Sequence, residues 1–187
     1  MADMFKSAGY ATGAFGKWHL GLGDKTGEQD WNAPLPASLG DLGFDYHYIM
    51  AATGDRVPCV FIENGQVANY DPSAPIEVSY VRNFEGEPTG RENPELLYNQ
   101  KSSHGHDMAI VNGIGRIGFM KGGGKALWKD ENIADSITSH AIDFIKKHRR
   151  GTYTTLLTEG RLNEHLHSID EQAHEQIDLH IAQMAKQ

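Results

Sequence analysis

Lys17 and His19 lie two residues apart in the stretch GYATGAFGKWHLG, directly after a short run of small residues. In an extended backbone, residues i and i+2 point to the same side, so the two side chains can converge on one ligand. Lysine supplies a fixed positive charge, and histidine supplies a titratable donor or acceptor. The pair therefore suits an anionic, tetrahedral ligand. The alternative is a strand end with a solvated lysine and a histidine hydrogen-bonded to backbone.

Arg56, His104 and His106 form a second set of candidate residues, within the stretches GDRVP and HGHD. Arginine and histidine side chains can hydrogen-bond sugar hydroxyls or carboxylates. The alternative is ordinary loop structure, with the arginine in a surface ion pair. His104, His106 and Asp107 also suggest a metal, but three ligands without a fourth are a weak signal for a metal site.

Residues 113–118 match the pattern G-x-G-x-x-G, which binds dinucleotide phosphates where it opens a helix. Three glycines at 122–124 interrupt any such helix, so this rival interpretation is weak. Cys59 is the only cysteine, which excludes an internal disulfide and a multi-cysteine metal site. We expect it to pack in a strand.

The elements that must position these residues alternate in the manner of an α/β domain, whose sites gather at the carboxyl ends of strands. Periodicity and turn signals predict, in chain order, a helix over 2–7, a strand over 10–15, an irregular segment over 25–56, a hairpin over 57–70 with its turn at Asn64-Gly65, a helical turn capped by Asn93, an irregular segment over 101–127 and a helix over 130–147. Beyond residue 151 an apolar stripe at three- and four-residue spacing predicts a single amphipathic helix.

Composition excludes several classes of protein. The net charge of −8 argues against a broad nucleic-acid surface. No apolar run is long enough to cross a membrane, and the start MADMFKSAGY shows no signal peptide. We therefore expect neither a nucleic-acid nor a membrane partner.

The stretch GYATGAFGKWHLG resembles the second signature of the formylglycine-dependent (type I) sulfatases, whose glycine-lysine-tryptophan-histidine loop lines the sulfate site. The resemblance continues through LGFDYHYIMAATGDRVPCVFIENGQV and HGHDMAIVNGIGRIGFMKGGGKALWKDE. These segments are similar to arylsulfatase-like enzymes of bacteria that break down sulfated carbohydrates. The resemblance covers about residues 1–147. It implies a sulfuric ester hydrolase acting on a sulfated carbohydrate or aryl sulfate ester, and an alkaline-phosphatase-like α/β fold that would here lack its N-terminal and C-terminal parts.

The resemblance also assigns roles to the candidate residues. Lys17 would hold the sulfate oxygens and the formylglycine hydroxyl and offset the charge on the transferring sulfuryl group. His19 would hydrogen-bond the formylglycine and help to remove its second hydroxyl proton. Arg56, His104 and His106 would recognise the substrate.

Departures from the family pattern predict an inactive chain. The family's nucleophile lies in a cysteine-x-proline-x-arginine motif, whereas Cys59 is followed by Val-Phe-Ile-Glu. Calcium needs about six to eight oxygen ligands, and we expect the family's aspartate and asparagine ligands to be absent here. The sequence thus predicts a chain without formylglycine or metal, able at most to bind a sulfate ester.

Residues 148–187 differ from the rest of the chain in composition and hydrophobic pattern, and they resemble a small transposon-encoded protein. We expect two parts, a sulfatase domain fragment over 1–147 and an unrelated helical tail over 148–187, joined by fusion or insertion. The tail's apolar stripe needs a partner helix, which would allow self-association. The alternative function is therefore a non-catalytic, helix-mediated interaction or a transposon-accessory role. Localisation is left open, since relatives of this family are commonly periplasmic or secreted.

Overall fold

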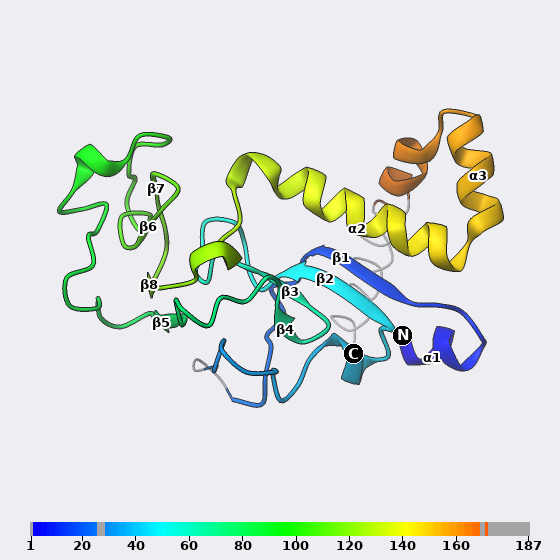
Figure 1. Ribbon diagram of the computed structural model, residues 1–187, viewed down its shortest axis with the longest axis horizontal. Coiled ribbons are helices and arrows are strands. Elements are labelled where there is room, and N and C mark those ends of the chain that lie inside the picture. Colours follow the sequence, from blue (N-terminus) through cyan, green and yellow to red (C-terminus); the bar gives the residue numbers. More distant parts are fainter. Residues whose placement is uncertain (1, 26–28, 169–170, 172–187) are drawn as a thin grey trace, which may run out of the picture. The chain divides into compact units, whose positions relative to one another are not determined.

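The computed structural model describes residues 2–25, 29–168 and 171 (Figure 1). The chain divides into two compact units, Met1–Ala141 and Ile142–Gln187. This division falls inside helix α2 (Ile133–His148). The boundary expected after residue 147 stays a prediction.

A four-stranded sheet forms the centre of the first unit, in the order β1-β2-β3-β4. Its strands are β1 (Gly13–Lys17), β2 (Tyr46–Met50), β3 (Phe61–Glu63) and β4 (Gln66–Val67). Strands β1 and β2 are parallel, whereas β2, β3 and β4 pair antiparallel. The mixed α/β fold class and the hairpin at Asn64-Gly65 are therefore confirmed. The first strand lies about three residues later than expected.

Strand β2 corrects the expectation that residues 25–56 are irregular. Four of its five residues are buried, and it hydrogen-bonds to β1 on one side and β3 on the other. A short apolar run without alternation is the pattern of a strand covered on both faces. The sequence YHYIM carried this signal.

The first half of α2 packs on the sheet through an aromatic stack. The His140 ring lies 3.6 Å from the Tyr48 ring of β2 with an interplanar angle of 6°, and Phe61 of β3 stacks on Tyr48 from a centroid distance of 4.7 Å. Ile133 and Ile137 also contact the core. A 3-10 turn, η4 (Asp130–Asn132), precedes α2, so the predicted helix over 130–147 is confirmed apart from its first turn.

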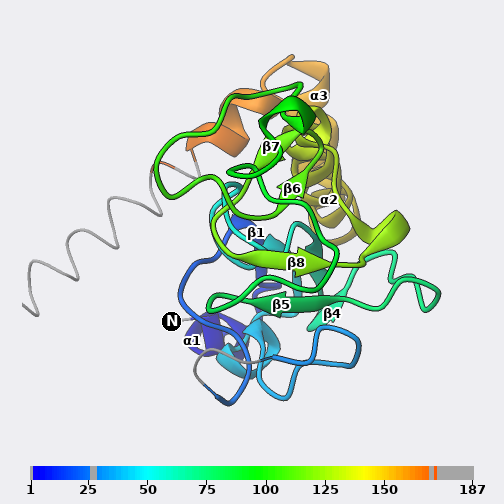
Figure 2. The ribbon, with the colours of Figure 1, turned by 90° about the vertical axis from the view of Figure 1, so that its left-hand side faces the viewer.

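Residues 77–121 form two small ladders, in which β5 (Glu77–Ser79) pairs with β8 (Phe119–Lys121) and β6 (Ile110–Val111) pairs with β7 (Ile114–Gly115) (Figure 2). The turn between β6 and β7 is Asn112-Gly113, with φ of 55° and 69°. The expectation of an irregular segment over 101–127 is thus wrong. So is the dinucleotide interpretation, because the G-x-G-x-x-G residues form a hairpin strand and lead into β8 rather than a helix.

The remaining elements are short. Helix α1 (Ala2–Ser7) forms as predicted. The 3-10 turns are η1 (Leu39–Leu42), η2 (Pro94–Leu96) and η3 (Gly124–Ala126). The helical turn expected at Asn93 forms, but the Asn93 side chain makes no capping hydrogen bond.

The second unit corrects the expectation of a single C-terminal helix. Helix α3 (Arg150–Thr158) is followed by the C-cap residue Glu159 and by Gly160, which adopts a φ of 67°, and helix resumes over residues 162–168. A left-handed glycine just past a helix end is a common terminator. The apolar stripe from Ile169 onward lies outside the described residues. None of the helices in the described residues combines the length and the apolar character needed to span a bilayer.

Candidate functional site

The carboxyl ends of β1 and β2 lie at the same edge of the sheet, because the two strands are parallel and Lys17 pairs with Met50. The backbone pairing continues past both strands. Trp18 N donates to Met50 O at 3.0 Å, and His19 N donates to Ala51 O at 3.1 Å. His19 therefore sits beside the chain that leaves β2, at the edge where α/β sheets place their ligands.

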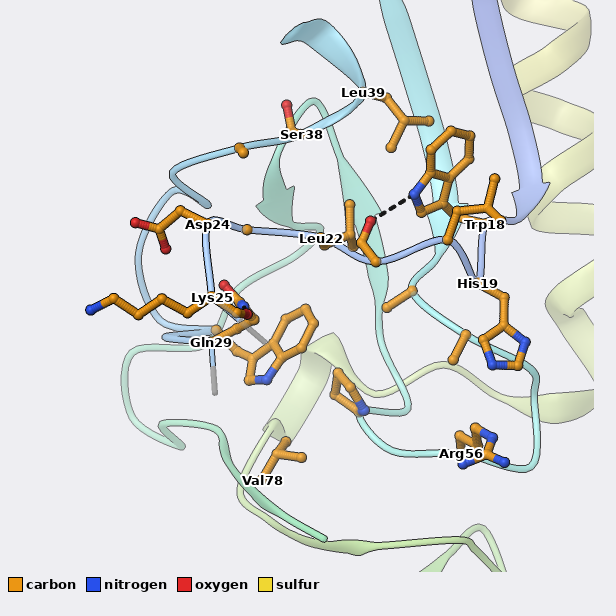
Figure 3. A pocket seen from close by; sticks show the side chains of 18 of the residues that line it. Trp18, His19, Leu22, Asp24, Lys25, Gln29, Ser38, Leu39, Arg56 and Val78 are labelled. Carbon is orange, nitrogen blue, oxygen red and sulfur yellow. Dashed lines mark hydrogen bonds between the residues drawn. The ribbon is translucent and has the colours of Figure 1, made fainter. Parts of the chain in front are cut away.

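A pocket of about 650 Å³ opens at this edge. Its walls are the loop after β1, the segment around η1, the chain leaving β2, and two residues near β5; they include Trp18–Lys25, Gln29, Trp31, Ala37–Leu39, Asp41, Leu42, Ala51, Ala52, Arg56–Pro58, Val78 and Tyr80. Figure 3 shows His19 and Arg56 at one end of this pocket and Asp24 and Lys25 at the other. The structure thus brings two of the predicted site residues together.

Lys17 is placed differently from His19. It is the last residue of β1 and exposed, and it is not among the residues that line the pocket. His19 has a φ of 54°, so the extended geometry on which the i, i+2 expectation rested has ended at this residue. Between them, the Trp18 indole donates from Nε1 to Gly21 O at 2.8 Å and contacts Phe44 edge-on, which fixes the start of the loop.

The backbone around Arg56 is held by a distant segment. Ile117 N donates to Asp55 O at 2.7 Å, and Val57 N donates to Ile117 O at 3.2 Å. Arg56 N closes a turn by donating to Thr53 O at 3.0 Å. Arg56 is half-buried and enters the pocket from a loop with little backbone freedom.

His106 reaches the same loop through Asp55, a residue that sequence reasoning missed. His106 Nε2 and Asp55 Oδ2 are 2.9 Å apart. Partial burial raises the pKa of Asp55, but hydrogen bonds from Thr53 and His106 outweigh it and the net pKa is lowered. His104 is exposed, and neither histidine lines the pocket. The only sequence signal for the Asp55–His106 pair is that Asp55 directly precedes the candidate residue Arg56.

A buried ion pair supports the loop from behind. Arg116 is 2% exposed; its Nη1 donates to Gly54 O and its Nη2 to Val111 O and to Asp130 Oδ2, at 2.6, 3.0 and 2.6 Å. Burial raises the pKa of Asp130, while hydrogen bonds from Arg116 and Asn112 outweigh it and lower the net pKa. Arg116 of the G-x-G-x-x-G segment is therefore structural, and it anchors Gly54 two residues before Arg56.

Cys59 does not fit the role of the nucleophile that the resemblance requires. It is fully buried, and burial raises the pKa of its thiol to about 12. A reactive cysteine is partly exposed and has a lowered pKa. Cys59 instead packs in the core two residues before β3, so it is buried as expected, but the expectation that it lies in a strand is wrong.

The described residues also do not fit the calcium ion that the resemblance implies. No group of three or more histidine, cysteine, aspartate or glutamate side chains converges in residues 2–25, 29–168 and 171. At the HGHD stretch, His106 is paired with Asp55, and both carboxylate oxygens of Asp107 accept from Arg91 at 2.8 and 3.2 Å. The candidate ligands there are already engaged by protein partners.

The geometry of the first unit defines an α/β fold with a pocket at the carboxyl ends of its parallel strands. Apolar and charged side chains line this pocket. The chain is 56% identical over 149 residues to an N-acetylgalactosamine-6-O-sulfatase of Bacteroides thetaiotaomicron, a match that covers 80% of this chain and 29% of that protein. It also matches a solved structure from work on the metabolism of multiple glycosaminoglycans by the same organism, with a TM-score of 0.75, 56% identity, and coverage of 79% of this chain and 30% of the other. The resemblance to sulfatases is confirmed.

The chain spans about 30% of the length of these relatives, as expected for a partial sulfatase domain. Residues 136–187 match the family described as transposon-encoded protein TnpV, which confirms the second resemblance. The sulfatase match extends over 149 residues, which is longer than the part of the chain that precedes residue 136. The sulfatase match and the TnpV match therefore overlap, and the overlap includes helix α2 from residue 136 onward.

Proposed function

We propose that the pocket at the carboxyl ends of β1 and β2 binds the sulfate group of a sulfated carbohydrate. The observation that carries this proposal is that His19 and Arg56, from separate loops, line the same end of one pocket (Figure 3). The arginine guanidinium is always charged and presents a planar fork of donors that suits a tetrahedral anion. The histidine ring adds an N–H donor.

Aromatic side chains in the same pocket support a sugar as the rest of the ligand. Trp18, Trp31 and Tyr80 all line it, and small-molecule sites combine such apolar surfaces with a few polar groups that fix orientation. The relative with 56% identity is described as an N-acetylgalactosamine-6-O-sulfatase, so sulfated N-acetylgalactosamine is the ligand that we propose first.

The other candidate residues act from outside the pocket in this proposal. Lys17 adds positive potential at the end of β1, and His106 positions the Arg56 loop through Asp55. His104 remains a substrate-recognition candidate by resemblance. We propose binding rather than hydrolysis, since Cys59 and the described acidic residues supply neither the nucleophile nor the calcium site of the family.

A calorimetric titration with N-acetylgalactosamine 6-sulfate and with unsulfated N-acetylgalactosamine tests the proposal. Losing a hydrogen bond to a charged group costs about 1.5–3 kcal/mol, so Arg56→Ala should weaken binding by at least about tenfold. Arg82→Ala is the matched control, because Arg82 is exposed and does not line the pocket. Equal binding of both sugars, or no loss in Arg56→Ala, would refute the proposal. Release of free sulfate by the chain would refute the restriction to binding.

The TnpV match favours a second candidate function for the C-terminal residues, which is helix-mediated interaction or a transposon-accessory role. Self-association through these residues is tested by light scattering after size-exclusion chromatography. The full chain and a form lacking residues 151–187 should differ in oligomeric state. An unchanged state would argue against it.

A further inference from the structure

His47 is a buried titratable residue that the proposed binding function does not use. It lies on β2, is 2% exposed, and its Nε2 accepts a hydrogen bond from Gly65 N at 2.8 Å. A backbone N–H can only donate, so this bond requires an Nε2 without a proton and places the imidazole proton on Nδ1. Nδ1 is buried and has no hydrogen-bond partner among the described residues. An imidazolium would carry protons on both nitrogens and could not accept from Gly65.

The bond to Gly65 holds more than the hairpin turn. Gly65 O accepts from Leu35 N at 2.8 Å, and a side chain at Gly65 would lie 3.2 Å from Ser38. The turn therefore packs directly against the segment that precedes and includes η1. Ala37 in that segment accepts from Gly23 N at 2.8 Å. Ser38 and Ala37 line the pocket, and so does the loop containing Gly23.

We propose that neutral His47 is a positioning residue that holds the pocket wall formed by residues 35–42, and that protonation of its imidazole releases this wall. The sequence of contacts runs from Nε2 of His47 to the Gly65 amide, from the Gly65 carbonyl to Leu35, and on to the wall. The backbone of His47 also holds the turn, because His47 N donates to Asn64 Oδ1 at 3.0 Å and Asn64 N donates to His47 O at 3.1 Å. Loss of the Nε2 bond therefore frees the Gly65 amide and its contacts to the wall while Asn64 stays paired with β2.

The surroundings of His47 favour its neutral form. Burial lowers the pKa of His47, and the nearby carboxylate of Glu63 on β3 opposes this without reversing it. Glu63 is itself engaged by the Tyr46 hydroxyl, at 2.7 Å. The folded pKa therefore lies below the usual value near 6.5.

The other elements around His47 supply no compensating charge in the described residues. Its register partner on β1 is Ala14. Asp41 of η1 accepts from Ser38 N at 2.8 Å as part of a capping box. Because adjacent residues of a strand point to opposite faces, His140, which stacks on the residue after His47, lies on the other face of the sheet.

The sign of the pH effect follows from the lowered pKa. A group that binds its proton more weakly in the folded state destabilises that state as pH falls below the unfolded pKa. The stabilisation from the His47–Gly65 bond is therefore fully present above pH 6.5 and decreases as the pH falls towards the folded pKa. In the folded chain the bond itself is lost when the pH falls through that lowered pKa.

Hydrogen exchange of the Gly65 amide in the full-length chain, without any ligand, tests the proposal independently of sulfate binding. After correction for the intrinsic exchange rate, protection at Gly65 and Leu35 should fall by up to about tenfold per pH unit as the pH is lowered below 6.5. In His47→Gln the amide oxygen can accept the same bond but does not titrate, so protection should be independent of pH. His140→Gln is the matched control and should keep the wild-type pH dependence.

Two results would overturn the proposal: protection at Gly65 that does not change with pH in the wild type, or the same pH dependence in His47→Gln. If His47→Gln does not fold, the ring resonances of wild-type His47 decide the matter. A His47 pKa at or above 6.5 rejects the proposal, and a lower value that coincides with the loss of Gly65 protection supports it. Sulfate binding that fails while this behaviour is found would reject the proposed function alone.

Discussion

Replacing Asp130 by alanine tests whether the buried ion pair supports the loop that carries Arg56. Arg116 is 2% exposed and donates to both Asp130 and Gly54, each at 2.6 Å. Removing one partner of a buried pair leaves an uncompensated charge and typically costs about 3–5 kcal/mol. The Asp130 side chain is 23% exposed, and Arg116 keeps its bonds to Gly54 and Val111. We therefore expect a loss of about 3 kcal/mol in the free energy of unfolding.

Urea denaturation followed by tryptophan fluorescence measures this loss. Asp130→Asn keeps an acceptor without the charge and should lose only about 1–2 kcal/mol. Glu77→Ala is the control, because the Glu77–Lys121 pair is about half exposed and should contribute less than about 1 kcal/mol. A loss in Asp130→Ala no larger than in Glu77→Ala would refute the reasoning.

The pH dependence of the same variant gives a second check. The net pKa of Asp130 is lowered from its usual 3.8, so its stabilisation is present above that value and is lost as pH falls through the lowered pKa. The difference in stability between the wild type and Asp130→Ala should therefore narrow below pH 3.8. A difference that stays constant there would show that the Asp130 charge contributes nothing.

Three further predictions concern single residues. Gly113→Ala places a side chain at a backbone φ of 69°. The neighbouring Tyr98 ring is exposed and able to move aside, so the cost is mainly backbone strain of about 1–2 kcal/mol. The thermal unfolding midpoint should fall, and an unchanged midpoint would contradict this prediction. A hydrogen bond from Lys6 lowers the pKa of Asp45 to about 2. The Lys6–Asp45 ion pair therefore persists above pH 3.8 and is lost as the pH falls through about 2. Lys6→Met should raise the pKa of Asp45 in an NMR titration, and an unchanged pKa would exclude the ion pair. Cys59 should resist a thiol reagent at pH 8 until the chain is denatured, whereas prompt labelling of the native chain would mean that the core around it opens.

Local signals in the sequence predicted the elements that depend on neighbouring residues. Helix α1 and the Asn64-Gly65 hairpin were found, since a helical face and a tight turn are both decided within a few positions. The same Asn-Gly signal stands at residues 112–113 and marks the β6–β7 hairpin, although the surrounding glycines favour irregular structure.

Long-range contacts account for the rest. Strand β2 is hydrogen-bonded between β1 and β3. Its short run of five residues is compatible with a buried strand, but only the pairing with its neighbours decides between a strand and another buried segment. The position of His19 and Arg56 in one pocket depends on the same strand pairing. The family resemblance indicated both residues as candidates, but their spacing in the sequence could not show that they lie together. Spacing in fact suggested Lys17 as the partner of His19, and the left-handed backbone at His19 removed the basis for that expectation.

Helix α2 lies within both the sulfatase match and the TnpV match from residue 136 onward, yet His140 in this overlap stacks on Tyr48 of the sheet. An α-helix makes its backbone hydrogen bonds with its own residues four positions away. If the predicted fusion lies within α2, it leaves the helix backbone intact and requires only that a few side chains on one face still fit. The same change inside β2 would strip two neighbouring strands of their partners. Helices at the edge of a fold are thus places where unrelated coding segments can be spliced with little damage to what precedes them.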